Sequence, residues 1–169
     1  MVHVLRYTRA WGVYINAYEE LQDQACTDSI DVIDYNFNSS NIKGLYCNDT
    51  VAINKSIATQ AEKSCVLAEK LGHHYTTAGN IIDQTNVSNQ KQEYRARFYG
   101  YSLKIGLRGI IRAYEAGCRS LYEMAEYLDA TEKNLQEALD CYKSKYGIYA
   151  VVDNYILYFE PLTVIHIIW

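Results

Sequence analysis

The sequence predicts an α+β fold in which a small antiparallel sheet packs on helices and is followed by a helical part and a C-terminal β-hairpin. Three observations support this. Between residues 31 and 54, short runs rich in Val, Ile and Tyr are separated by Asn, Asp and Ser, which is typical of short strands joined by turns. Longer segments on both sides repeat apolar residues at helical spacing. After Gly147, Tyr, Val and Ile dominate again.

The first third of the chain is expected to hold one helix and three strands. Residues 11–25 place Val13, Ala17 and Leu21 on one side of a helix. Asn48-Asp49 is the expected turn of a hairpin, and the polar run 36–41 is a loop. The strands are predicted at 31–35, 44–47 and 51–54.

Two further helices are predicted at 56–74 and 89–104, with a polar loop over 76–90 between them. The second of these helices has Ala96, Tyr99 or Gly100, and Leu103 on its apolar stripe, and Glu93 falls on the same stripe. A carboxylate on an inward face needs a partner, which makes Glu93 a candidate functional residue. The apolar stripe of the helix at 56–74 consists of Ala58, Ala61, Cys65, Ala68 and Leu71 or Gly72.

The remainder is predicted to be helical up to residue 146. Helices are expected at 107–116, 120–128 and 132–145, the last two with helix-turn-helix spacing. Residues 147–169 are expected to form a hairpin that turns at Asp153-Asn154 and ends in an apolar tail. Burial of that tail in a homodimer, or against the sheet, would account for its composition.

Composition and charge narrow the functional classes. The 169 residues carry a formal net charge of −4, which argues against general attraction to nucleic acid or to anionic membranes. The helix 132–145 mixes acids with lysines and has no arginine near its start, unlike helices that read a major groove. No run reaches the roughly 18 apolar residues of a membrane span, and the N-terminus lacks the apolar run of a secretory signal. We expect a cytoplasmic protein with no membrane partner and no nucleic-acid partner.

The residues most suggestive of chemistry are Glu69, His73 and Glu93. Glu69 and His73 are four residues apart, so they share one face of a helix. A catalytic zinc site commonly takes three protein ligands and leaves a fourth position for water, and a following helix could supply Glu93. The simpler alternatives are a solvated Glu69–His73 pair and an exposed Glu93–Arg97 ion pair.

The run from Ala61 to Asn80, Ala-Glu-Lys-Ser-Cys-Val-Leu-Ala-Glu-Lys-Leu-Gly-His-His-Tyr-Thr-Thr-Ala-Gly-Asn, resembles the active-site helix of the ImmA/IrrE family of metallopeptidases. That helix often reads Leu-Ala-Glu-Glu-Leu-Gly-His-His/Tyr in members from mobile elements. The run Glu93-x-x-Ala96-x-x-Tyr99 is similar to the family's second motif, Glu-x-x-Ala-x-x-Phe. The resemblance covers about residues 30–160 and is most specific between Cys65 and Gly79.

The resemblance implies a zincin-like metallopeptidase core over residues 1–105, a helix-turn-helix-like part over 106–146, and the hairpin and tail over 147–169, together one compact unit. It also implies a cytoplasmic zinc endopeptidase that cuts a helix-turn-helix repressor of a phage or an integrative element. By position, Glu69, His73 and Glu93 would hold Zn²⁺.

Lys70 departs from the family pattern, because it stands where the general base would be. A base must accept a proton from metal-bound water, and a lysine with a pKa near ~10.4 is already protonated. Three replacements are conceivable: His74, which is placed first because it titrates near neutral pH; Glu62; or a retraction of Lys70. Lys70 could also pair with Glu69 and occlude the metal position.

Three hypotheses follow for the function. The chain is a metallo-endopeptidase acting on a helix-turn-helix repressor, or a catalytically inactive relative that binds the same partner, or a DNA-binding regulator.

Overall fold

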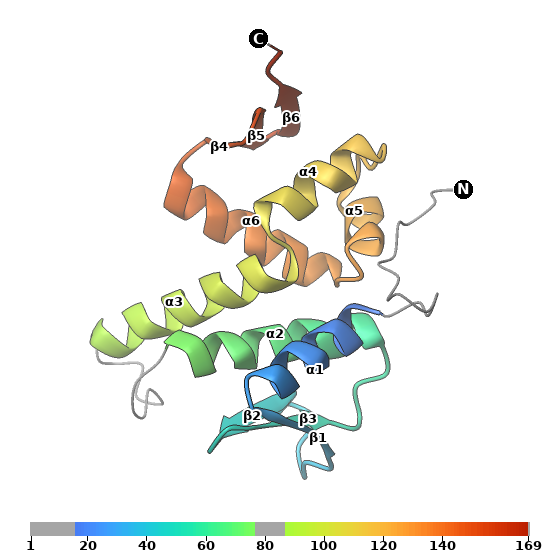
Figure 1. The fold of residues 1–169 in the computed structure, drawn as a ribbon, viewed down its shortest axis with the longest axis vertical. Helices are drawn as coiled ribbons and strands as arrows, with labels where there is room; N and C mark the ends of the chain where they lie inside the picture. Colours follow the sequence, from blue (N-terminus) through green and yellow to red (C-terminus); the bar gives the residue numbers. More distant parts are fainter. Residues whose placement is uncertain (1–15, 77–86, 169) are drawn as a thin grey trace. The chain divides into compact units, whose positions relative to one another are not determined.

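The computed structural model describes residues 16–76 and 87–168. The chain has an α+β fold with two small three-stranded sheets (Figure 1). It divides into two units, with the boundary between Lys104 and Ile105. No helix in the described ranges is long and apolar enough to cross a lipid bilayer.

The sheet of the first unit contains β1 (Asp31–Tyr35), β2 (Gly44–Cys47) and β3 (Thr50–Asn54) in the order β1-β3-β2. The predicted turn between β2 and β3 is confirmed: Asn48 and Asp49 have φ values of 47° and 55°, as a two-residue hairpin turn of the primed type requires.

The prediction that this sheet is purely antiparallel is wrong. β2 and β3 are antiparallel, but β1 pairs in parallel with β3, with Asp31 opposite Thr50. A two-residue turn makes β2 and β3 antiparallel. β1 runs opposite to β2 and joins β3, so it is parallel to β3. Alternation of apolar residues does not indicate which hairpin strand the third strand joins.

Two helices pack with this sheet, α1 (Ala17–Thr27) and α2 (Gln60–Thr76). Asn16 caps α1 through a reciprocal box with Glu19. The predicted start at residue 11 falls outside the described residues. α2 begins four residues later than predicted, because the Thr59 hydroxyl accepts a hydrogen bond from the amide of Glu62 at 3.1 Å and so caps the helix there. Their shared core includes Leu21, Ala25, Val51, Ile53, Leu67 and Leu71.

The last helix of this unit, α3 (Val87–Lys104), packs along α2 (Figure 1). Ala68 of α2 lies beside Gly100, and Gly72 lies beside Ala96, so the two helices run antiparallel. Of the two alternatives on the predicted stripe of α3, Gly100 faces α2, whereas Tyr99 is exposed.

The second unit contains α4 (Leu107–Glu115), α5 (Leu121–Tyr127) and α6 (Glu132–Tyr146), followed by β4 (Tyr149–Val152), β5 (Tyr155–Phe159) and β6 (Leu162–His166). The strands form an antiparallel meander in the order β4-β5-β6. The predicted hairpin is therefore only part of the sheet, because the apolar tail supplies a third strand. Ala150 and Leu157 are buried, whereas Val151 and Ile165 on the opposite face are exposed.

Candidate metal centre

The candidate site rests on an unusually close approach of α2 and α3. A Cβ added to Gly72 would lie 2.2 Å from the carbonyl oxygen of Ala96, and one added to Gly100 would lie 2.8 Å from the carbonyl oxygen of Ala68. Only glycine permits such backbone contact. The approach brings the side chains that flank Gly72 on α2 within reach of those on α3.

His73 lies between the two predicted carboxylates. Its Nε2 atom is 3.5 Å from Glu93 Oε2 and 4.0 Å from Glu69 Oε1. Only 15% of the His73 side chain is exposed, against 31% for Glu93 and 43% for Glu69. The structure therefore brings together three residues that the sequence places on two separate helices.

The surroundings of His73 favour the neutral imidazole. Burial lowers its pKa below the ordinary value, and this effect outweighs the attraction of Glu93 and Glu69 for a proton. The positive charges of Lys70 and Arg97 act in the same direction as burial. A neutral imidazole is the form in which histidine binds metal ions.

Lys70 is drawn into the same cluster. Its Nζ lies 2.6 Å from Glu69 Oε1, and 20% of its side chain is exposed. Neighbouring residues on a helix do not normally face each other, so the lysine stem bends back to make this contact. The Glu69 oxygen nearest His73 is thus already bound by a cation.

The donors fit a metal ion only in part. Tetrahedral zinc with bonds of about 2.0–2.2 Å spaces its ligand atoms roughly 3.3–3.6 Å apart. The 3.5 Å separation of His73 and Glu93 fits this spacing, whereas the 4.0 Å separation of His73 and Glu69 is longer. Across the described ranges 16–76 and 87–168, no set of three or more His, Cys, Asp or Glu side chains is arranged to hold an ion as it stands. Lys70 would compete with an ion for the Glu69 oxygen that lies nearest His73.

His74, the residue expected to replace the general base, is engaged elsewhere. Its Nδ1 is 2.6 Å from the Tyr46 hydroxyl and 3.6 Å from Asp49 Oδ1, at the β2–β3 hairpin. Its ring also packs edge-on against Tyr46 and Tyr75. Glu62, the second replacement considered, pairs with Lys43 at 3.2 Å. Both side chains hold the sheet and α2 together.

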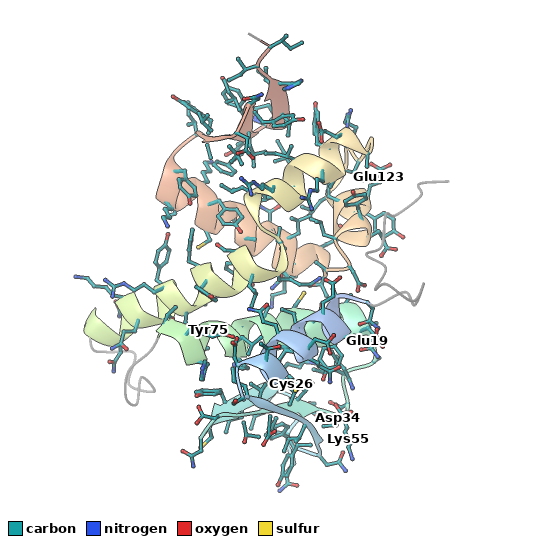
Figure 2. The ribbon with its side chains drawn as sticks, viewed as in Figure 1. Glu19, Cys26, Asp34, Lys55, Tyr75 and Glu123 are labelled. Atoms are coloured by element: carbon teal, nitrogen blue, oxygen red, sulfur yellow. The ribbon has the colours of Figure 1, made fainter. Side chains whose placement is uncertain are left out.

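Several residues were not identified as contributors to the site from the sequence, although Gly72 and Gly100 were named as alternatives on the predicted apolar stripes. Gly72 and Gly100 make the helix approach possible, and a glycine inside a helical pattern was the available signal. Tyr75, near the C-terminal end of α2 (Figure 2), donates a hydrogen bond to Asp28. Its ring also contacts that of Tyr99 on α3 at a tilt of 45°, with ring centroids 5.2 Å apart. Burial and the bond to Asp28 raise the pKa of Tyr75 to about 12, so it stays a donor.

In comparisons with known proteins, no family model, no curated protein and no solved structure matches this chain.

Proposed function

We propose that this chain is an ImmA/IrrE-like metallo-endopeptidase homologue that acts on a helix-turn-helix repressor of a mobile genetic element, with hydrolysis weakened or lost. On this account binding of the repressor is the activity that persists. The observation that carries the proposal is the ion pair between Lys70 Nζ and Glu69 Oε1 at 2.6 Å, beside the imidazole of His73.

Metal-assisted hydrolysis requires a bound metal ion and a general base, and the ion pair affects both. A zinc ion held by Glu69, His73 and Glu93 would polarise the scissile carbonyl and lower the pKa of bound water. Lys70 occupies an oxygen of one of these residues and cannot itself accept a proton at neutral pH. Loss of general-base assistance typically costs about 10²–10⁴ in rate. Two carboxylates also make a more anionic ligand set than two histidines, which opposes hydroxide formation.

The sheet of the same unit offers a surface for a protein partner. Ile33 and Leu45 are both in register with Ala52, so the three residues form a row across one face. Ile33 is 44% and Leu45 is 51% exposed. β2 is an edge strand, and an edge strand can pair with an extended segment of another protein. Tyr46 on β2 contacts His74 at the end of α2, so a segment on this edge would run close to the candidate site.

The test uses the chain and the repressor encoded nearest to its gene. Wild type should retain the repressor in a pull-down and cut it slowly or not at all. Lys70→Glu, which restores a carboxylate at the family's base position, should increase zinc-dependent cleavage by at least about 10-fold. Lys55→Glu is the control, because it makes the same charge change at an exposed turn.

Two results would count against the proposal. If neither wild type nor Lys70→Glu binds or cuts the repressor, the assigned partner is wrong. If wild type cuts as fast as Lys70→Glu, hydrolysis is not weakened by the lysine.

A further inference from the structure

We propose that Lys70 is the resident counter-ion of this site, and that its ammonium group occupies the position on Glu69 which a divalent metal would otherwise take. The inference rests on the proposed function and extends it. The chain would fold and bind its partner without metal, and a metal ion would bind only by displacing Lys70.

Among the described residues, the carboxylates and the cations of this cluster are equal in number. Glu69 and Glu93 contribute two carboxylates, which lie 4.0 and 3.5 Å from His73 Nε2. Lys70 and Arg97 contribute two positive charges, and both are close enough to influence the imidazole. The guanidinium of Arg97 also donates to the Tyr101 hydroxyl at 3.0 Å, so its charge is held at this part of α3. A divalent ion would add charge to a balanced cluster and meet repulsion from both cations.

The geometry makes Glu69 the point of competition. Glu93 is already at ligand spacing from His73, but Glu69 is 0.5 Å farther from His73 Nε2 (4.0 against 3.5 Å) and is bonded to Lys70. The Glu69 oxygen that lies nearest His73 Nε2 is therefore the oxygen that the lysine binds. Lysine has a flexible four-carbon stem, so it can be displaced without unfolding α2. Metal affinity should then be set by the strength of this ion pair.

The experiment measures metal affinity directly. The full-length chain, without a histidine tag, is titrated with Co²⁺ and then with Zn²⁺, by calorimetry and by the visible absorption of bound cobalt. Lys70→Met removes the ammonium and keeps the apolar stem. We expect Lys70→Met to bind either ion at least about 10-fold more tightly than wild type, with one ion per chain, and EDTA to leave the melting temperature of wild type unchanged.

Two controls make the result specific. Lys63→Met removes another ion-paired lysine of α2, the partner of Asp34 at 3.0 Å, and should leave metal affinity as in wild type. Lys70→Met/Glu93→Gln should lose the gained affinity. If Lys70→Met does not fold, as judged by circular dichroism, Lys70→Gln takes its place.

The inference is overturned if wild type binds zinc as tightly as Lys70→Met, if Lys63→Met gives the same gain, or if the gain survives Glu93→Gln. A pull-down of the repressor in EDTA separates this outcome from failure of the proposed function. Capture by wild type without any gain in Lys70→Met rejects the counter-ion and keeps the function. Tight metal binding by Lys70→Met without capture rejects the function and keeps the counter-ion.

Discussion

Gly72 of α2 lies so close to Ala96 of α3 that a Cβ at Gly72 would come within 2.2 Å of the Ala96 carbonyl oxygen. This contact fixes the separation of the two helices that carry the candidate site. Because the contacting atom belongs to the backbone, it cannot turn away as a side chain would. The distance between His73 and Glu93 therefore depends on a residue that has no side chain.

Gly72→Ala should separate α2 from α3 and destabilise the first unit. Overpacking typically costs about 1–3 kcal/mol, and a backbone contact places this site at the upper end, as measured by urea unfolding. Gly109→Ala on α4 is the control, because its Cβ would meet only the Leu128 side chain, at 3.2 Å. Alanine also has a helix propensity better by about 1 kcal/mol, so this control should be neutral or stabilising. Equal destabilisation by both variants would show that the contact between Gly72 and the Ala96 carbonyl does not require glycine.

Much of the local structure was predictable from the sequence. β1 and β2 have the predicted bounds, because alternating apolar residues between turn-forming Asn and Asp define short strands. The positions of Glu69 and His73 on one helical face follow from spacing alone. The parallel pairing of β1 was missed, because the choice of pairing partner is not encoded in the local apolar pattern. The third strand of the meander, β6, was taken as an apolar tail, although it pairs with the strand directly before it.

The candidate site was predictable only as a set of residues. The pairing of Lys70 with Glu69 was one of the alternatives drawn from the sequence, and the structure shows it at 2.6 Å. Spacing did not favour it, since adjacent helical residues point apart. The turning of His74 toward Tyr46 depends on where the β2–β3 hairpin packs. The His74–Tyr46 contact joins residues 28 positions apart in the sequence, so helical spacing could not predict it.

Asn54 should be sensitive to loss of its side-chain amide. It is 2% exposed, its Nδ2 donates to the carbonyl oxygen of Ile42 at 2.7 Å, and its Oδ1 accepts from the amide of Ser56 at 2.9 Å. Asn54→Leu would leave both backbone groups without this partner, which costs about 1–3 kcal/mol each when the group stays buried. Thermal or urea unfolding measures the loss. Exposed Asn41→Ala should change stability by less than about 0.5 kcal/mol; similar values for the two variants would contradict this role.

Protonation of Glu123 should destabilise the second unit at acid pH. Its carboxylate accepts hydrogen bonds from the amides of Arg119 and Ser120 at the start of α5, and these bonds lower its pKa below the ordinary value. A lowered folded-state pKa gives stability that is present above the unfolded-state pKa and is lost as the pH falls through the folded-state pKa. Glu123→Gln should flatten the decline of the free energy of unfolding with falling pH, whereas Glu126→Gln on the same helix should not. An unchanged slope in Glu123→Gln would contradict the assignment.

His74 should contribute to stability and not to proton transfer. Tyr46→Phe removes the hydroxyl that lies 2.6 Å from His74 Nδ1, and loss of one such bond costs about 0.5–1.5 kcal/mol. The His74→Ala variant should also lose stability. In the Lys70→Glu background, however, His74→Ala should leave the rate of repressor cleavage unchanged within about 3-fold. A decrease of about 10²-fold or more in the cleavage rate, the size expected for loss of a general base, would show that His74 takes part in proton transfer.

If Glu69, His73 and Glu93 form one site whose cation is Lys70, removal of the lysine should open that site to zinc. The most direct measurement is a crystal structure of Lys70→Met grown with zinc, with diffraction data collected at the zinc absorption edge. The account predicts one anomalous peak about 2.0–2.2 Å from His73 Nε2 and from an oxygen of each glutamate. A peak elsewhere, or no peak with the three side chains directed apart, would contradict it.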